Sequence, residues 1–308
     1  MVLSFVIPCY RSEKTVTLVI EEIIKTVSEK NEYDYEIIAV NDCSPDNVYD
    51  VLKECAKKNK KLKVIDLAKN VGKHAALMAA FAEVQGDYVI CLDDDGQCPI
   101  DYLWELIEPL NNGYDMSVAK YPKNKQAFYK NIGSKMNSMM TRVLLDKPKD
   151  FVFSNFVARK RFVCEKIIEY KNPYPYLEGI SLSITRNIAF VPMEERSRIS
   201  GITGYSLRKS ISLWLNGFTA FSVKPLRISS FIGLICAIIG FVFGIVTIVR
   251  KFVVSNVSVG WSSTISIMLF IGGLLMLMLG MIGEYIGRIY ISINNSPQYV
   301  IREKLNLK

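Results

Sequence analysis

The stretch Asp87-Tyr-Val-Ile-Cys-Leu-Asp-Asp-Asp-Gly-Gln-Cys-Pro99 begins as an apolar strand and ends in three consecutive carboxylates followed by a turn. Adjacent carboxylates repel one another unless a cation lies among them. Asp93 and Asp95 are one residue apart, so both can reach a single ion, and carboxylate oxygens suit Mg²⁺ or Mn²⁺. The alternative is a solvent-exposed acidic loop. The position directly after an apolar strand favours the metal site, and the spacing excludes an EF-hand.

Apolar strands alternate with helical patterns over the first 119 residues. We expect strands at Leu3–Ile7, Tyr35–Val40, Leu62–Leu67, Asp87–Leu92 and Tyr114–Ala119, with helices at Ser12–Glu29, Asp46–Lys58, Lys73–Val84 and Asp101–Leu110. This alternation predicts an α/β fold built on a mainly parallel sheet. Such sheets bind ligands beyond the carboxyl ends of their strands. Val40-Asn-Asp-Cys-Ser-Pro-Asp46 and the Asp93–Asp95 cluster should therefore share one edge of the sheet.

The alternation ends after residue 120. We expect a long helix at Lys125–Leu145, a short apolar stretch at Phe151–Ala158, a strand at Arg186–Pro192 and a further helix at Tyr205–Trp214. The last of these combines apolar with basic residues, which is typical of a helix lying in a membrane interface. An ordinary surface helix is the alternative for that segment.

Two apolar stretches follow, Ile228–Val249 and Trp261–Gly283, with 22 and 23 residues and no charged side chain. As helices each would span about 33 Å, which is enough for a bilayer core of about 30 Å. Buried core helices are the alternative, but these rarely run so long without a polar face. We therefore predict a transmembrane hairpin. The flanking Lys and Arg residues are nearly balanced and do not set its orientation.

The net charge of +8 is unevenly distributed along the chain: it is −9 over residues 1–119, +13 over 120–227 and +4 over 228–308. A basic segment leading into the membrane suits anionic lipid and a lipid phosphate. The single histidine, His74, excludes a His-rich metal site, and we expect it to cap or pack near a helix start. Seven scattered cysteines without a CxxC motif disfavour zinc sites and disulfides and indicate a reducing compartment. Motifs for dinucleotides, P-loops and nucleic acids are missing from the sequence, so these partners are not expected.

Four segments have to be considered together: Phe5-Val-Ile-Pro-Cys-Tyr10, Val40–Asp46, Asn70-Val-Gly-Lys73 and Gly86–Pro99. In this order they resemble the family 2, GT-A-type glycosyltransferases. Later segments resemble the polyprenyl-phosphate glycosyltransferases in particular: Arg198–Tyr205, Phe221–Arg227 and Gly283–Tyr290, then Pro297 and Tyr299. The resemblance implies a GT-A (Rossmann-like) catalytic domain at 1–203, an interfacial amphipathic helix and linker at 204–227, a membrane hairpin at 228–287 with spans at about 228–250 and 261–284, and a C-terminal tail at 288–308.

The resemblance also implies roles for individual residues. It assigns nucleotide-sugar binding to Pro8, Tyr10, Asp42, Lys73, Asp93, Asp94 and Asp95. The metal group would be Asp93, Asp95 and Gln97, and the catalytic residues Asp93, Asp95, Asp150 and Arg198. For the acceptor phosphate it points to Arg198 and Tyr205, and Lys120 and Arg159 are candidates to replace arginines that the family pattern has and this chain lacks. An ordinary surface role is the alternative for Arg159.

The sequence departs from the family pattern at the acceptor-phosphate site. Asp150 aligns with an Asp-Phe-Arg segment of the family, but this chain reads Asp150-Phe-Val-Phe and lacks the arginine. Arginines expected after Tyr114–Ala119 are also absent, and Lys120, Lys123 and Lys125 stand nearby. Lysine supplies a point charge but no bidentate fork. The acceptor-phosphate site is therefore less well defined than the donor site.

The activity implied is the inverting transfer of a hexose or N-acetylhexosamine from a nucleotide sugar, with UDP as the expected nucleotide, to polyprenyl (undecaprenyl) phosphate. A Mg²⁺ or Mn²⁺ ion would stabilise the leaving diphosphate. The attacking lipid phosphate is largely ionised at neutral pH and needs no strong general base. The lipid-linked sugar would serve to modify a cell-surface glycan.

Nucleotide sugars are cytosolic, so we expect the catalytic domain and both termini on the cytoplasmic side of a bacterial inner membrane. Relatives suggest a homo-oligomer, in particular a tetramer. Two other hypotheses remain open: a glycolipid or polysaccharide synthase of the same fold, and a catalytically impaired membrane scaffold. The intact acidic cluster disfavours the scaffold, whereas the missing arginines favour it.

Overall fold

The computed structural model describes residues 1–30, 32–122, 154–172, 175–194, 196, 231–236, 238–242, 245–246, 249, 260–294 and 297–307. The chain divides into two compact units. One consists of Met1–Ser212 together with Asn295–Lys308, and the other of Leu213–Asn294. The segments expected as helices at 125–145 and 205–214 lie outside the described residues.

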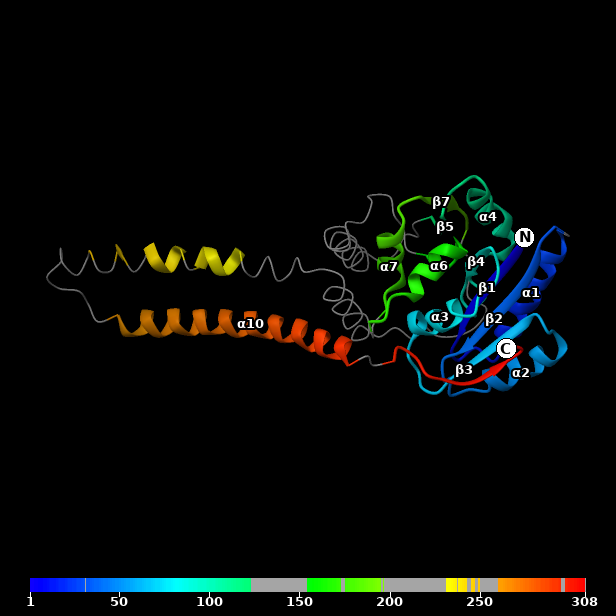
Figure 1. The fold of residues 1–308 in the computed structure, drawn as a ribbon. Coiled ribbons are helices and arrows are strands. Elements are labelled where there is room, and N and C mark those ends of the chain that lie inside the picture. Colours follow the sequence, from blue (N-terminus) through cyan, green and yellow to red (C-terminus); the bar gives the residue numbers. More distant parts are fainter. Residues whose placement is uncertain are drawn as a thin grey trace. The chain divides into compact units, whose positions relative to one another are not determined.

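A mixed eight-stranded sheet forms the first unit, in the order β7-β5-β6-β4-β1-β2-β3-β8 (Figure 1). Its strands are β1 Val2–Cys9, β2 Asp34–Asn41, β3 Leu62–Leu67, β4 Tyr88–Cys91, β5 Met116–Lys120, β6 Val157–Lys160, β7 Ile188–Pro192 and β8 Ile301–Leu305. β1 pairs in parallel with β2 and β4, β2 with β3, and β5 with β7. β6 runs antiparallel to β4 and β5, and β8 to β3. The mainly parallel α/β sheet predicted from the sequence is confirmed.

Helices cover both faces of this sheet. They are α1 Val16–Ser28, α2 Val48–Lys58, α3 Lys73–Phe81, the 3-10 turn η1 Ile100–Tyr102, α4 Leu103–Asn111, α6 Arg161–Ile168 and α7 Leu177–Ile184. Side chains of α1, α2 and α4 share one core cluster with Phe5 of β1 and Ala158 of β6. The neighbouring Arg159 points the other way, with its guanidinium carbon 5.8 Å from the ring centre of Phe81 in α3. Because successive side chains of a strand face opposite sides, α3 covers the second face.

β8 comes from the very end of the chain, which the sequence indicated only as a tail. It forms the edge of the sheet beside β3. Asn306 donates hydrogen bonds to the carbonyls of Ala56 (2.9 Å) and Leu62 (2.8 Å), and Lys304 pairs with Glu83 at 2.6 Å. Charged residues are common on edge strands because they discourage pairing with other chains. The same charges conceal the apolar alternation by which a strand is recognised in sequence.

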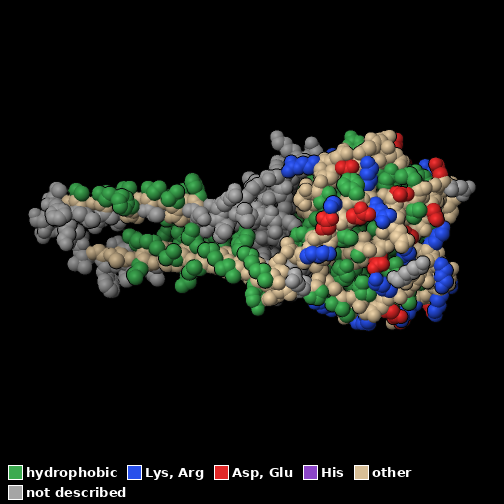
Figure 2. Space-filling view, in the orientation of Figure 1, with side chains coloured by type: hydrophobic (Ala, Val, Ile, Leu, Met, Phe, Trp, Pro, Cys, Tyr) green, Lys and Arg blue, Asp and Glu red, His purple; other side chains and the backbone are tan. Residues whose placement is uncertain are grey.

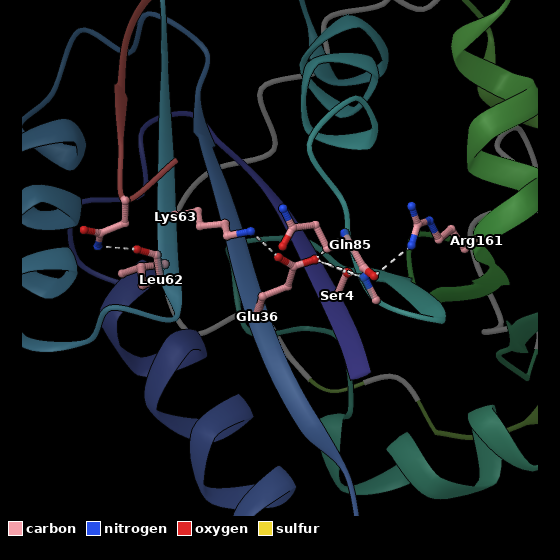
Figure 3. Close-up of polar contacts among 8 residues, drawn as sticks. Ser4, Glu36, Leu62, Lys63, Gln85 and Arg161 are labelled. Carbon is pink, nitrogen blue, oxygen red and sulfur yellow. Dashed lines mark hydrogen bonds and ion pairs between the residues drawn. The ribbon is translucent and has the colours of Figure 1, made fainter. Parts of the chain in front are cut away.

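A buried carboxylate joins β1, β2 and β3 (Figure 3). Glu36, only 5% exposed, accepts hydrogen bonds from Ser4 Oγ and Lys63 Nζ, both at 2.5 Å, and from the Gln85 amide at 2.6 Å. Gly86 also donates to Ser4 Oγ, and a Cβ at this position would lie 2.7 Å from the Val2 carbonyl oxygen. Only glycine therefore fits where the chain enters β4, the strand that carries the acidic cluster.

The second unit contains a long apolar helix, α10 Trp261–Ile293, of 33 residues. Its Phe270–Ile293 stretch has a mean hydropathy of 1.7 and is long enough to cross a membrane. Figure 2 shows hydrophobic side chains along it, and Met276, Phe270 and Ile293 are each about 70% exposed. A shorter apolar helix, Phe231–Val242, lies within the first expected span. Lipid is the environment in which such exposed apolar side chains are stable.

Candidate active site

The segments that follow β1, β2 and β4 meet at one edge of the sheet, as expected for the carboxyl ends of parallel strands. The Tyr10 amide donates to Asp94 Oδ2 at 3.0 Å and joins the β1 end to the β4 end. The Asp42 amide donates to the Cys9 carbonyl at 3.0 Å and joins the β2 end to the same place. Pro8, one residue before the end of β1, is buried, whereas Tyr10 is 44% exposed.

Each of the three adjacent carboxylates has a different partner. Asp93 forms an ion pair with Lys73, at the start of α3. Asp94 turns back to the Tyr10 amide, and Asp95 Oδ1 accepts a hydrogen bond from the Gln97 amide at 3.1 Å. The turn is completed by Gly96, whose φ of +75° favours glycine. Asp94 is thus bonded to the end of β1, whereas Asp93 pairs with the start of α3 and Asp95 bonds within its own turn.

Burial and charge shift the pKa values of this group. Burial raises the pKa of Asp94 to about 6, although the hydrogen bond from the Tyr10 amide acts to lower it. For Lys73, burial disfavours the ammonium, but attraction to Asp93 outweighs this and raises the pKa above its usual value. Lys73 therefore stays charged at neutral pH. Such perturbed groups gathered at a strand end are typical of a functional site.

Asp42 holds the turn that leads into α3. Its carboxylate accepts hydrogen bonds from the amides of Val71 (2.7 Å) and Gly72 (2.9 Å) and from the Asn70 side chain (3.0 Å). Gly72 has a φ of +84°, a conformation that glycine adopts without strain. Burial raises the pKa of Asp42, and the two amide bonds act in the opposite direction. Asp42 thus fixes the position from which Lys73 reaches Asp93.

No set of three His, Cys, Asp or Glu side chains is gathered for a metal ion within the described part of the chain. Mg²⁺ is commonly held by only one or two carboxylates together with substrate phosphates. Asp93 and Asp95 supply two carboxylates on one turn, and the Gln97 side chain belongs to the same turn. This donor set fits a hard divalent cation that binds together with a diphosphate.

A cavity adjoins the Lys73–Asp93 pair. Its lining combines charged, polar and apolar residues: Lys73, His74, Leu77, Cys91, Leu92, Ser154, Asn155, Val157, Arg159, Leu177 and Glu178. Three buried polar atoms of these residues have no hydrogen-bond partner in the part of the chain that the structure describes: His74 Nδ1, Arg159 Nε and Glu178 Oε2. Unpartnered buried polar atoms are costly to a folded protein unless a ligand or water satisfies them.

The charged residues of this cavity and its histidine come from three elements, α3, β6 and α7. Arg159 in β6 is only 5% exposed, and its Nη1 donates to Cys91 Sγ at 3.2 Å. His74 Nδ1 lies 3.7 Å from Glu178 Oε2 and packs edge-on against the Tyr176 ring. The sequence indicated Arg159 but not Glu178, because only the fold brings the start of α7 to the start of α3. For the His74–Glu178 pair, the only signal available in the sequence was the position of the single histidine directly after Lys73.

The structure thus brings most predicted donor-site residues together. Pro8, Tyr10, Asp42, Lys73, Asp93, Asp94, Asp95 and Gln97 share the edge, and Arg159 lines the adjoining cavity. Lys120 ends β5 as an exposed residue and is not among the residues that line the cavity. Asp150, Arg198 and Tyr205 lie outside the described residues. Arg196 lies close by in sequence to Arg198, and its amide donates to the Gln97 carbonyl at 3.2 Å.

Two family models match this chain. "Glycosyl transferase family 2" matches residues 4–168, which include the whole acidic edge. The chain belongs to this family. "GtrB C-terminal hairpin" matches residues 224–289, the region of the two apolar stretches. The resemblance inferred from the motifs is therefore confirmed in both halves of the chain.

Relatives of this chain align with it over almost the full length. The chain is 30% identical to "Uncharacterized glycosyltransferase YkcC" of Bacillus subtilis, covering 99% of this chain and 94% of the relative. It is also 30% identical to "Bactoprenol glucosyl transferase" of Shigella phage SfV, covering 99% of both. Among solved structures, glucosyl-3-phosphoglycerate synthase from Mycobacterium tuberculosis, in complex with Mn²⁺ and UDP-glucose, superposes with a TM-score of 0.51 at 18% identity, covering 70% of this chain and 76% of that one. This likeness shows a shared GT-A-like fold.

Proposed function

We propose that this glycosyltransferase moves a hexose or N-acetylhexosamine from a UDP-sugar to undecaprenyl or a related polyprenyl phosphate, with inversion at the anomeric carbon. The observation that carries the proposal is the full-length match to a bactoprenol glucosyl transferase, which includes the membrane hairpin as well as the catalytic domain. A water-soluble acceptor would give no reason for a glycosyltransferase to carry a membrane hairpin. The lipid-linked product would be a sugar source for a cell-surface glycan.

The acidic edge is suited to a nucleotide sugar. We assign the nucleotide to the β1 and β2 ends, at Pro8, Tyr10 and Asp42, and the diphosphate to Lys73 and the Asp93–Gln97 turn. Mg²⁺ or Mn²⁺, held by Asp93 and Asp95 with the Gln97 side chain, would supply positive charge to the departing diphosphate. Lys73 lies at the first turn of α3, where the helix dipole also favours an anion. Asp94 keeps the turn in place through the Tyr10 amide.

The reaction itself is one displacement. An oxygen of the lipid phosphate attacks the anomeric carbon while the bond from this carbon to the diphosphate oxygen breaks, so that the nucleoside diphosphate leaves with the electron pair. The sugar passes through an oxocarbenium-like state. Because the phosphate is already ionised, no proton has to be removed from the nucleophile. The protein's main tasks are to position both substrates and to stabilise charge.

The cavity beside Lys73 is where we place the sugar and the attacking phosphate. Arg159 carries a buried guanidinium with no carboxylate bonded to it among the described residues, and its Nε lacks a partner. The phosphate is the ligand that best compensates such a charge. Lys120 adds charge at the end of β5. By resemblance, Arg198 and Tyr205 are assigned to the acceptor side and Asp150 to the catalytic residues.

The strand pairing supports a hairpin with both ends on one side of the membrane. β8 follows α10 in the chain and yet pairs with β3 of the catalytic unit. The chain that leaves the catalytic unit therefore returns to it, which requires an even number of crossings. Since nucleotide sugars are cytosolic, we assign the catalytic unit and both termini to the cytoplasmic side of a bacterial inner membrane. The boundaries at residues 203, 227 and 287 and a tetrameric assembly belong to the same proposal.

The direct test uses the full chain purified in detergent. It is incubated with undecaprenyl phosphate, Mg²⁺ or Mn²⁺ and individual UDP-hexoses and UDP-N-acetylhexosamines, and the lipid product is read by mass. We expect one mono-glycosylated lipid monophosphate, formed only when metal, donor and acceptor are all present. Sugar polymer as the product would indicate a polysaccharide synthase. No transfer with any donor would favour the membrane scaffold.

A further inference from the structure

We propose that Arg302, in the strand that follows the membrane helix, is a positioning residue for nucleotide-sugar binding. It acts through Asp66 and Asn41 on the loop that carries Asp42. The inference rests on the proposed function, because it presumes that this loop contacts the nucleotide.

The first link joins the end of the chain to β3. Arg302 Nη1 donates to Asp66 Oδ2 at 3.0 Å, and Nη2 donates to the Ala68 carbonyl at 3.2 Å. The Asp66 side chain is 1% exposed, whereas that of Arg302 is 57% exposed. Arg302 therefore covers a buried carboxylate from the solvent side and is the charged partner of this carboxylate. A buried carboxylate that loses its cation is strongly unfavourable.

The second link joins Asp66 to the end of β2. Asn41 Nδ2 donates to Asp66 Oδ1 at 2.7 Å, so that both carboxylate oxygens are used. Asn41 Oδ1 in turn accepts a hydrogen bond from the Ser44 amide at 3.1 Å. The amide group of Asn41 is thus fixed in one orientation by a partner on each side. Asp66 determines which way it faces.

The third link is the loop itself. Ser44 Oγ accepts a hydrogen bond from the Arg11 amide at 2.7 Å and donates to Asp46 at 2.6 Å. The segment after β1 and the segment after β2 each contain a non-glycine residue with positive φ, Arg11 at +58° and Cys43 at +48°. Such conformations persist only when the surroundings enforce them. Without a fixed Asn41, the 41–46 loop loses a constraint that holds it in this shape.

The consequence is that the donor site depends on a residue encoded after the membrane segment. Residues 213–294 separate Arg302 from the rest of the catalytic unit in sequence. The nucleotide loop is therefore fully supported only once the chain has passed through the membrane segment and returned to the catalytic unit. This couples donor binding to correct insertion of the hairpin.

The test compares Arg302→Gln with Lys304→Gln in the full chain. Lys304 belongs to the same strand and pairs with Glu83, just after α3, so the control loses an ion pair on the same strand. Among the described residues, this pair has no hydrogen bond to Asp66 or Asn41. For Arg302→Gln we expect the KM for the UDP-sugar to rise about tenfold. A rise of this size corresponds to the loss of one hydrogen bond to a charged group. The kcat at saturating donor and the KM for undecaprenyl phosphate should stay within about twofold, and Lys304→Gln should match the wild type. An unchanged donor KM in Arg302→Gln, or an equal rise in both variants, would overturn the positioning role.

A double variant distinguishes positioning from simple stability. In Arg302→Gln/Asp66→Asn the buried charge is gone, while the new amide oxygen can still accept from Asn41. We expect the donor KM to return to within about twofold of the wild type, and a double variant no better than the single one would also overturn the role. If Arg302→Gln does not fold, Arg302→Lys replaces it with the same expectation, because lysine cannot bond Asp66 and the Ala68 carbonyl as a fork. A wild-type chain that transfers no sugar would refute the proposed function instead, and UDP binding by calorimetry then tests Arg302 separately.

Discussion

The ammonium group of Lys73 forms an ion pair with Asp93, although the two residues follow different strands and are 20 positions apart. The same carboxylate is one of the two that fit a divalent cation. On the proposed metal assignment, Lys73 and the metal ion would compete for Asp93 in the absence of substrate. A bound diphosphate would resolve this competition, because its oxygens can pair with the lysine and the metal together.

Replacing Lys73 by Gln should consequently have opposite effects on two ligands. We expect Mn²⁺ to bind more tightly in the absence of nucleotide, by about threefold to tenfold, because one cation no longer competes for Asp93. The UDP-sugar should bind about tenfold more weakly, because the diphosphate loses a charged donor. Mn²⁺ titration by electron paramagnetic resonance and donor titration by calorimetry measure the two effects. Weaker binding of both ligands would show that Lys73 and the metal act together rather than in competition.

The metal assignment has a sharper test in Asp95→Asn. This change keeps the shape of the turn and an acceptor for the Gln97 amide, but it removes one of the two metal-binding charges. We expect the rate of transfer to fall at least about 100-fold while the protein still inserts into the membrane. Product formation is measured by mass and insertion by carbonate extraction. Near-normal transfer by this variant would contradict the role of Asp95 in metal binding.

How far the sequence alone predicted this molecule depends on how local the signal was. The five strands expected up to residue 119 lie within two residues of β1 to β5, because each is an apolar run bounded by turns. The acidic edge followed from a general property of parallel sheets. β8 was missed because its Ile-Arg-Glu-Lys-Leu sequence has three charged residues, and its strand character comes from pairing with β3. Such pairing between segments more than 230 residues apart leaves no local pattern.

The cavity was predicted less completely for a related reason. Arg159 was a candidate only because family arginines were missing, and nothing in its neighbourhood in sequence indicates that it is buried beside Phe81. The His74–Glu178 pair joins the first turns of α3 and α7, which are about 100 residues apart. Both features depend on which helix covers which face of the sheet. This information exists only after the chain has folded.

Glu178 offers a test of whether the cavity receives substrate. Its buried Oε2 lies 3.7 Å from His74 Nδ1 but has no hydrogen-bond partner among the described residues, so Glu178→Ala removes a group that contributes little to stability. We expect an unchanged or slightly higher melting temperature, an unchanged affinity for UDP, and a transfer rate about tenfold or more lower, because the sugar loses a partner. Glu169→Ala, which removes an exposed partner of Lys166, serves as the control and should leave all three unchanged. A large drop in melting temperature with normal transfer would instead assign Glu178 to the core.

Glu36 makes stability depend on pH in a direction that can be worked out. Burial alone would raise its pKa, but hydrogen bonds from Lys63, Ser4 and the Gln85 amide outweigh this and hold the pKa below the usual value of 4.5. A carboxylate with a lowered pKa in the folded state stabilises the fold fully above pH 4.5, and this contribution is lost as the pH falls through the folded-state pKa.

Glu36→Gln should therefore lower the free energy of unfolding at pH 7 by about 1–3 kcal/mol, since Lys63 loses its charged partner. The melting temperature of the variant should also fall less between pH 5 and pH 3 than that of the wild type, while Glu21→Gln, an exposed change in α1, should follow the wild-type curve. Parallel curves for Glu36→Gln and the wild type would show that Glu36 is not the group that titrates.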